Sequence, residues 1–269
     1  MASPAIFVLL TDFGLQDPYV GQMKGVLLQG CPGCAILDLS HEVRPQSIVQ
    51  GGFFLAASWP HLPPGSVCLG VVDPGVGTGR GLLLIKKQGR YLLVPDNGLA
   101  GQVLDLDGEH TLWSLAGQRA LHPASSTFHG RDVFAPLAVR LIQQSGPGPE
   151  WRPLTQGPAR GMNAVRPVCE GRKLKTTVLH IDRFGNCILN LGIDEWTGVI
   201  SGHSQWRLLE PASCRVRLVQ TYAHLSDDDV GILKGSQTMY ELAMNQISCA
   251  RRLNLEIGSR CVLEPVSGT

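Results

Sequence analysis

Short apolar runs alternate with amphipathic stretches over the first half of the chain. Residues 5–10, 35–39 and 66–72 are apolar runs with the length of buried β-strands. Between them, residues 18–29 and 45–58 carry apolar side chains at helical spacing. Alternating strands and helices are typical of a parallel sheet with helices on both faces. We therefore predict an N-terminal, three-layer, Rossmann-like α/β domain with a mostly parallel sheet.

Local residue chemistry places further boundaries in this domain. Asp17 and Pro18 predict an N-cap followed by proline at the first helical position. Residues 81–87 and 91–94 flank a Gln-Gly-Arg turn, which indicates a hairpin. Residues 131–144 have the pattern of an amphipathic helix that ends at a Gly/Pro-rich turn.

The pattern changes after a proline-rich crossing at residues 146–172. Seven short strand-like runs follow, at residues 174–181, 187–191, 205–209, 216–221, 230–233, 239–244 and 261–263. This spacing is typical of a small all-β barrel or sandwich. We predict two domains, an α/β domain at residues 1–165 and a smaller all-β domain at residues 172–269.

Charge and hydropathy exclude two classes of partner. The chain has 23 basic and 22 acidic residues, so its net charge of +1 creates no field for nucleic acid or anionic lipid. No apolar run approaches the roughly 20 residues of a membrane span. The apolar N-terminus lacks a basic region before it and is interpreted as a strand, not a signal peptide. We expect a cytoplasmic protein that binds neither nucleic acid nor membrane.

Eight cysteines are scattered singly, apart from Cys31 and Cys34 in a CxxC sequence. In a cytosolic chain most cysteines are small buried apolar residues. The CxxC pair is also compatible with a redox pair or half a zinc site, but no second CxxC or HxxxH accompanies it. A structural role is favoured, and we expect no metal or cofactor.

Polar residues follow each of the three predicted parallel strands. Thr11 and Asp12 follow the first, the Asp38–His41 segment follows the second, and Asp73 follows the third. Ligands of such sheets bind beyond the carboxyl ends of the strands, so these residues predict a site there. Asp12 is well placed to accept hydrogen bonds from vicinal hydroxyls such as a ribose diol; a turn or capping aspartate is the alternative.

The loop at residues 73–80 is the most unusual segment. Asp73 leaves a buried strand, and a glycine-rich loop brings Arg80 back seven residues later. The loop lacks the Lys-Ser/Thr ending of a P-loop. An aspartate and an arginine in one tight loop indicate a carboxylate held ionised by a fixed cation, or a structural pair that pins the turn. His129 precedes a predicted helix, can titrate near neutrality and is predicted to meet this loop in one cleft.

One turn of the β domain combines an acid, an aromatic ring and an amide. Asp182, Phe184 and Asn186 have the chemistry to hydrogen-bond and stack on a purine, or to bind the polar end of an amino acid. Segments near the C-terminus, which contain Ser236, Glu241 and Met244, supply further candidate contacts. Taken alone, each of these segments is also an ordinary turn.

Taken together, the motifs resemble those of the S-adenosyl-L-methionine (SAM) hydroxide adenosyltransferase family, which is related to the fluorinases and chlorinases. The resemblance spans nearly the whole chain, at residues 11–25, 38–41, 71–80, 95–98, 128–132 and 181–186. It implies an N-terminal α/β domain, a C-terminal β-barrel, and a homotrimer with active sites at the subunit interfaces. The implied reaction converts SAM and water into adenosine and L-methionine.

The resemblance also implies a role for each candidate residue. Asp73 would orient and deprotonate the water, and Arg80 and His129 would tune the charge. The implied substrate contacts are Asp12 at the sugar, Asp182, Asn186 and Ser236 at the methionine end, Phe184 near the ligand, and Gln46, Glu241 and Met244. No metal is required, because the sulfonium carbon already carries a neutral leaving group.

Departures from the halogenating relatives bear on the nucleophile. Those relatives have Tyr at the position of Asp73, and Thr and Ser at the positions of Val76 and Gly130. A carboxylate repels a halide, so water is the expected nucleophile. Gln46 replaces their Trp over the sugar, and Gln237 replaces their Arg, which bears on the methionine carboxylate contact.

Two other classes of function stay open. A metal-dependent hydrolase would use carboxylates and imidazoles at the strand ends, namely Asp12, Asp17, Asp38, His41, Asp73 and His129. A non-catalytic protein would bind SAM or adenosine without turnover. Halide transfer is a minor option within the family.

Overall fold

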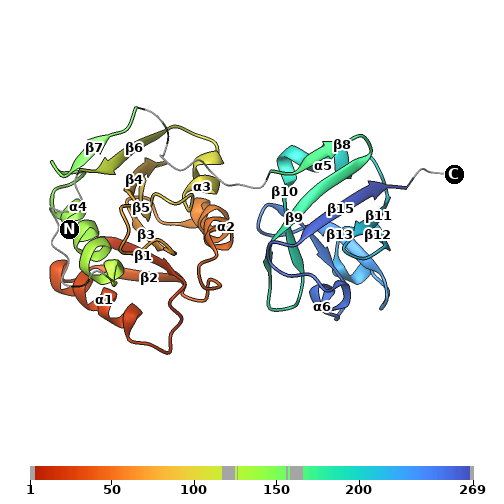
Figure 1. Ribbon diagram of the computed structural model, residues 1–269, viewed down its shortest axis with the longest axis horizontal. Helices are drawn as coiled ribbons and strands as arrows, with labels where there is room; N and C mark the ends of the chain where they lie inside the picture. The colour runs from red at the N-terminus through yellow and green to blue at the C-terminus, as the bar shows by residue number, and fades with distance from the viewer. Residues whose placement is uncertain (1–3, 117–124, 126, 156, 158–165, 267–269) are drawn as a thin grey trace. The chain divides into compact units, whose positions relative to one another are not determined.

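The computed structural model describes residues 4–116, 125, 127–155, 157 and 166–266. The chain divides into two compact units, Met1–Ala164 and Val165–Thr269 (Figure 1). The predicted domain limit at residue 165 lies outside the described residues, as does most of the crossing between residues 156 and 165, so the predicted limits stay a prediction.

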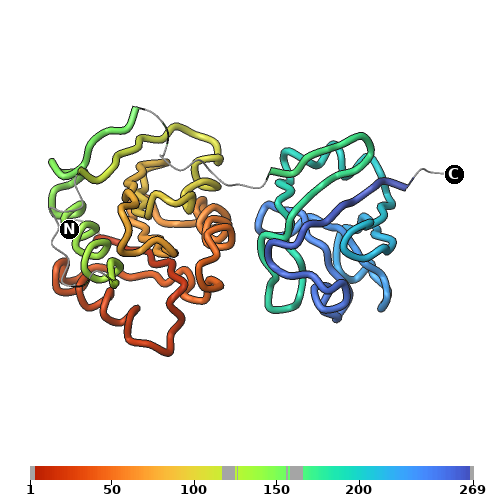
Figure 2. Tube along the Cα trace, viewed as in Figure 1, coloured from red at the N-terminus to blue at the C-terminus, as the bar shows by residue number. Residues whose placement is uncertain are grey.

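A sheet of seven strands forms the first unit. Across the sheet the strands are β2 (Ala35–Ser40), β1 (Ile6–Thr11), β3 (Val67–Val71), β5 (Arg90–Pro95), β4 (Leu82–Lys87), β6 (His110–Leu115) and β7 (Trp151–Pro153). Each of the pairs β2–β1, β1–β3 and β3–β5 is parallel, and the other neighbours are antiparallel. Along the chain, α1 connects β1 to β2 and α2 lies between β2 and β3, which can be followed in the red and orange part of the trace in Figure 2.

Helices cover both faces of this sheet (Figure 1). They are α1 (Tyr19–Gly30), α2 (Ile48–Ser58), α3 (Gly101–Asp105) and α4 (Ala135–Gln143), with a 3₁₀ turn at Trp59–His61. Phe7 and Leu9 of β1 pack into one core with α1 and α4, whereas Val8 and Leu10 pack into a second core with α2 and α3. All four side chains are fully buried, which explains the unbroken apolar run of this strand. The predicted three-layer α/β fold is confirmed.

Three predicted details of the first unit differ from the structure. Pro18 takes the N-cap position of α1 without any side-chain cap, so the predicted Asp17 cap is wrong. β2 is not a buried strand: it lies at the sheet edge, and its Leu37 is 43% exposed. The predicted helix at residues 131–144 begins with a π-helical turn, Gly130–Phe134, before α4.

The second unit is a closed barrel. Its seven strands are β10 (Cys187–Gly192), β14 (Met239–Ala243), β13 (Val230–Lys234), β12 (Cys214–Leu218), β11 (Gln205–Glu210), β15 (Arg260–Pro265) and β9 (Lys173–Ile181), in order around the ring. Pairing of β9 with β10 closes the ring, and β8 (Val168–Glu170) pairs with the outer part of β9. The strands β12 and β13 form the parallel pair in an otherwise antiparallel ring. The predicted C-terminal barrel is confirmed.

Apolar side chains fill the interior of the barrel. Trp206 and Tyr240 are its largest fully buried residues. Two short helices, α5 (Ile193–Ile200) and α6 (Cys249–Leu253), pack residues into the same core, a role that the sequence pattern did not predict. Among the described residues, no helix combines the length and the apolar character needed to cross a bilayer.

Candidate active site

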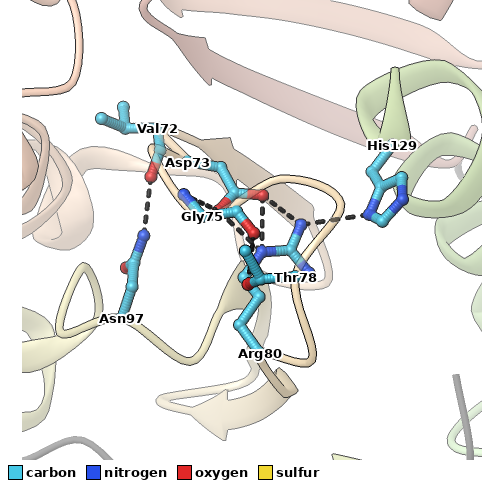
Figure 3. Close-up of polar contacts among 7 residues, drawn as sticks. All are labelled: Val72, Asp73, Gly75, Thr78, Arg80, Asn97 and His129. Carbon is cyan, nitrogen blue, oxygen red and sulfur yellow. Dashed lines mark hydrogen bonds and ion pairs between the residues drawn. The ribbon is translucent and has the colours of Figure 1, made fainter. Parts of the chain in front are cut away.

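The loop after β3 folds back so that Arg80 meets Asp73 (Figure 3). The Nε of Arg80 donates to both carboxylate oxygens of Asp73 at 2.6 Å, and Nη2 donates to Oδ2 as well. The two side chains are 1% and 5% exposed, respectively. A buried, forked ion pair fixes the orientation of the carboxylate as well as balancing its charge. The predicted contact between Asp73 and Arg80 is therefore present.

Local hydrogen bonds connect residues within this loop. The Oδ1 of Asp73 accepts from the Gly75 amide at 3.2 Å, and the Thr78 hydroxyl donates to the Gly75 carbonyl at 2.7 Å. Gly77 has a φ of 77°, a left-handed conformation that suits glycine. Asn97 donates to the backbone carbonyl that directly precedes Asp73, at 2.9 Å (Figure 3). Asn97 thus supports the loop from a second turn of the same unit.

His129 reaches Arg80 from a distant part of the sequence (Figure 3). The Nη2 of Arg80 lies 3.3 Å from the Nδ1 of His129. A guanidinium can only donate, so Nδ1 accepts and neutral His129 carries its proton on Nε2. Burial, followed by the charge of Arg80, lowers the pKa of His129 below its ordinary value of 6.5, although Asp73 and Asp132 partly oppose the shift. The contact therefore favours a neutral imidazole whose Nε2–H is a donor.

A π-helical turn directly after His129 determines where this side chain lies. A Cβ at Gly130 would be 3.0 Å from the Met23 sulfur and 3.1 Å from the Phe128 ring. Phe128 in turn packs edge-on against Phe13, with ring centroids 5.7 Å apart. Glycine lets the turn approach α1 closely, and π-helical turns are frequent at functional sites.

Asp12 lies in the loop between β1 and α1. Its Oδ2 accepts from the amide of Gln46 at 2.8 Å, and Gln46 adopts a left-handed φ of 66°. Burial raises the pKa of Asp12, the Gln46 amide partly offsets that rise, and the negative charge of Asp73 adds to it. Because β1 and β3 are parallel neighbours, Asp12 lies beyond the same ends of the strands as Asp73, and Gln46 is held there by its bond to Asp12.

Two of the carboxylates proposed as metal ligands, Asp38 and Asp73, have cationic side chains as partners. Asp38 contacts the ammonium group of Lys24 at 2.5 Å and the Nε2 of His41 at 3.1 Å. Asp73 is paired with Arg80, as described above. Within the part of the chain that the structure describes, no three His, Cys, Asp or Glu side chains are arranged to hold a metal ion. The candidate set for a metal-dependent hydrolase is therefore divided between separate contacts.

In the second unit, Asp182 organises the turn between β9 and β10. Its Oδ1 accepts from the amides of Phe184 and Asn186, each at 2.9 Å, and its Oδ2 accepts from the Asn186 side chain at 2.9 Å. Asn186 is 6% exposed, whereas the Phe184 side chain is 79% exposed. The acid and the amide thus build the turn, and the turn presents the aromatic ring to solvent.

Glu241 adds a second carboxylate near Asp182. It is 5% exposed and accepts a hydrogen bond from the hydroxyl of Tyr222. Burial raises the pKa of Glu241; the Tyr222 hydrogen bond opposes the rise, and the charge of Asp182 adds to it. Tyr222 was not among the predicted residues, because an isolated tyrosine in a polar segment carries no recognisable pattern.

The two remaining candidates of the second unit lie in contrasting environments. Ser236 is exposed in the turn between β13 and β14. Met244 is 3% exposed and belongs to the barrel core. Asp182 and Asn186 are hydrogen-bonded, and the residues that follow Asn186 pair with the part of β14 that contains Glu241, so these three residues lie close together. Met244 packs with apolar neighbours.

Comparisons with known proteins match both units. The model of the SAM hydroxide adenosyltransferase N-terminal domain matches residues 7–148, and that of the C-terminal domain matches residues 176–262. The (R)-S-adenosyl-L-methionine hydrolase of Thermus thermophilus is 36% identical over 93% of this chain and 95% of its own. The hydrolase of that name from Methanocaldococcus jannaschii is 37% identical over 71% of this chain and 69% of its own. A fluorinase from Actinoplanes is more distant, at 25% identity over 94% of this chain and 95% of its own.

Solved structures share the same architecture. An uncharacterized conserved protein from Thermotoga maritima superposes with a TM-score of 0.84 at 27% identity, over 96% of this chain and 99% of its own. A conserved hypothetical protein from Thermus thermophilus superposes with a TM-score of 0.72 at 30% identity, over 98% and 100%. The predicted resemblance is confirmed, and the chain belongs to the SAM hydroxide adenosyltransferase family.

Proposed function

We propose that this protein is a SAM hydrolase, which converts SAM and water into adenosine and L-methionine. The observation that carries the proposal is the hydrogen-bonded set of Asp73, Arg80 and His129 beyond the carboxyl end of β3. The names of the relatives support the substrate and the reaction. The polar set supports the chemistry, because it provides one acceptor and two donors for a single water molecule.

The sulfonium group of SAM makes the leaving group easy to expel. When the water oxygen bonds to C5′, the C5′–S bond breaks and its electron pair stays on neutral methionine sulfur. The enzyme must therefore orient the water in line and shield it from bulk solvent. We assign the water proton to Asp73, which passes it on to solvent after methionine leaves. Three donors, Nε and Nη2 of Arg80 and the Gly75 amide, share the roughly four acceptor sites of the Asp73 carboxylate, which leaves room for a water molecule to donate.

Arg80 and His129 complete the proposed water site. Among the described residues, the buried Nη1 of Arg80 has no hydrogen-bond partner. An unpaired buried donor is costly, so a ligand oxygen that accepts from it stabilises the bound state. The Nε2–H of neutral His129 supplies a second donor. Both donors stabilise the negative charge that develops on the attacking oxygen.

We assign the other candidates to substrate binding. Asp12, beside Gln46, would accept from the ribose hydroxyls. Asp182, Asn186 and Ser236 would bind the methionine end, Phe184 would pack on the ligand, Glu241 would add a carboxylate near Asp182, and Met244 would support these residues from the barrel core.

Water is favoured over a halide as the nucleophile. The Asp73 carboxylate is at the centre of the proposed site and would repel an anion. Gly130 occupies the position where halogenating relatives have Ser. A Cβ at Gly130 would have atoms of Met23 and Phe128 within 3.1 Å, which leaves little room for a side chain.

We also propose a cytoplasmic homotrimer with active sites at the subunit interfaces. The family resemblance supports the assembly. All eight cysteines are free thiols, which supports a reducing compartment.

The test is incubation of the purified protein with SAM in ¹⁸O-labelled water. We expect the label in the 5′-hydroxyl of adenosine and none in methionine. Bound SAM or adenosine without turnover would instead establish the non-catalytic alternative. A 5′-halo product that forms only with added chloride would establish halide transfer.

A further inference from the structure

His41 joins the two loops that surround Asp12. The parallel pairing of β1 and β2 slips by one residue, so that Leu10 pairs with Ser40 and the next residues, Thr11 and His41, come side by side. The Nδ1 of His41 lies 2.9 Å from the Thr11 hydroxyl. Both residues are buried, at 4% and 0% exposure. The bulge in the sheet therefore places an imidazole directly behind the Asp12 loop.

The contacts of His41 continue to the protein surface. Its Nε2 lies 3.1 Å from Oδ1 of Asp38, and Oδ2 of Asp38 contacts Lys24 at 2.5 Å. Burial opposes ionisation of Asp38, but the hydrogen bond from Lys24 and then the nearby His41 lower the pKa of Asp38 below its ordinary value. The Nε2 atom has no hydrogen-bond partner among the described residues, so its contact with Asp38 is an ion-pair contact and not a hydrogen bond. The ring is therefore held by the hydrogen bond between Nδ1 and the Thr11 hydroxyl, with the Asp38 carboxylate beside its other nitrogen.

Three further hydrogen bonds surround Asp12: one lies within its own loop, and two join that loop to the segment after β2. The Thr11 hydroxyl accepts from the Phe13 amide at 3.3 Å, the His41 carbonyl accepts from the Gly14 amide at 2.8 Å, and Asp12 accepts from the Gln46 amide at 2.8 Å. Asp12 is therefore flanked on both sides in the chain by residues whose positions depend on His41 or Thr11.

We propose that His41 is a positioning residue that acts through Thr11 to hold the Asp12 carboxylate in its substrate-binding orientation. Asp38 and Lys24 anchor the imidazole from the surface. This inference rests on the proposed function, since it assigns Asp12 to the ribose. A misplaced Asp12 should weaken the binding of SAM and leave the chemical step at Asp73 largely intact.

The test compares Thr11→Val and His41→Gln with wild-type enzyme. Thr11→Val has nearly the same shape and removes only the hydroxyl. We expect the KM for SAM to rise about tenfold in both variants and kcat to change less than about twofold. In an Asp12→Ala background, the same substitutions should raise KM no further, because residues that act through one another are non-additive. Asp38→Asn changes the half-exposed partner of His41 and should cause a smaller rise in the KM for SAM. This variant provides the test if His41→Gln does not fold.

Lys87→Met is the matched control. Lys87 is also buried, with its ammonium group bonded to the carbonyls of Leu106 at 2.6 Å and Gly108 at 2.8 Å. Lys87 is opposite Arg90 at the turn between β4 and β5, and the next residue of β5 pairs with the first residue of β3. Lys87 therefore lies at the amino ends of the parallel strands, whereas Asp12 lies beyond their carboxyl ends. This variant should lose stability without a change in KM. An unchanged KM in Thr11→Val, or a KM rise that adds fully to that of Asp12→Ala, would overturn the inference.

A second readout does not depend on catalysis. The amide proton of Gln46 donates to Asp12, so its hydrogen exchange relative to amides of β3 should be about tenfold faster in Thr11→Val and unchanged in Lys87→Met. If the wild-type protein fails to hydrolyse SAM, the proposed function fails, but faster exchange at Gln46 would still support the positioning role. Unchanged exchange would overturn it.

Discussion

At the scale of single residues, the Asp73 carboxylate is the group on which turnover depends. Asp73→Asn retains the size of the side chain but places an amide donor against the donors of Arg80 and removes the proton acceptor. We expect kcat to fall by about 10³-fold, the size typical of a lost general base. Adenosine binding, measured by calorimetry, should change less than about threefold, because the adenosine contacts are assigned to other residues.

Thr78→Val is the control for Asp73→Asn. The exposed Thr78 side chain donates to the Gly75 carbonyl within the loop at 2.7 Å. This variant should retain most of the turnover. Unchanged turnover in Asp73→Asn would remove Asp73 from the proposed mechanism.

A second residue-scale prediction concerns the pH dependence of turnover. Protonation of His129 would turn its Nδ1 into a donor facing Arg80, so the neutral form is the competent one. Burial and the charge of Arg80 lower the pKa of His129 below 6.5. We therefore expect kcat/KM to be constant above pH 6.5 and to fall as the pH decreases through the lowered pKa.

Amide substitutions of His129 test this assignment. The amide oxygen of His129→Asn can accept from Arg80 near the Nδ1 position and does not titrate. This variant should keep partial activity and lose the acid limb, whereas His129→Gln, whose amide lies nearer Nε2, should be less active. An acid limb that is unchanged in His129→Asn would assign the titration to another group.

How far the sequence predicts the site depends on how far apart its residues lie in the chain. The contact between Asp73 and Arg80 is predictable because seven residues and three glycines allow few ways of closing the loop. The meeting of His129 with this loop was also predicted, but the geometry of its contact with Arg80 depends on the close packing at Gly130, which no local pattern reveals. The hydrogen bond of Tyr222 to Glu241 joins residues 19 apart in the chain, and their pairing emerges only from the fold.

At the scale of elements, the turn that carries Asp182 depends on a glycine. Gly185 has a φ of 89°, and a Cβ there would lie 2.1 Å from the Ser248 hydroxyl, at the start of α6. Gly258, in the same unit, has a φ of 88° with no atom within 4 Å of a Cβ. The two positions therefore share one backbone conformation and differ in the space around them.

This pair separates conformational strain from steric clash. Gly258→Ala should reduce the free energy of unfolding by about 1 kcal/mol, the cost of the left-handed conformation. Gly185→Ala should cost about 1–3 kcal/mol more, because Ser248 and α6 must move. Chemical denaturation of the full chain measures both changes. Equal losses in the two variants would show that α6 yields without cost.

Elements were predictable where burial imposes a simple pattern. β1 and β3 are buried on both faces and appear as unbroken apolar runs. β2 is also mostly apolar, apart from Asp38 and Ser40, but it lies at the edge of its sheet, and the sequence does not show that an outer neighbour is lacking. The helices α5 and α6 were missed because they are short, and each interrupts a series of strands.

At the scale of the whole molecule, the fold and the chemistry together predict independence from metal ions. A metal bound at the strand ends would have to displace Arg80 from Asp73, or Lys24 and His41 from Asp38. We therefore expect kcat to be unchanged after dialysis against EDTA. Loss of activity that Mg²⁺ or Zn²⁺ restores would support a metal-dependent hydrolase instead.

The proposed assembly predicts complementation between inactive subunits. If each active site combines the first unit of one subunit with the second unit of another, Asp73→Asn and Asp182→Asn damage different halves of a site. Refolding the two variants together should restore about a quarter of wild-type activity, the fraction of sites with both halves intact in a random symmetric oligomer. Asp182→Asn retains an acceptor for the turn amides, so the barrel should fold. Co-refolding Asp73→Asn with Arg80→Ala is the control, because both lesions lie in the first unit and no intact site can form. Absence of recovery in the first mixture, with oligomers confirmed by light scattering, would place each complete site within a single chain.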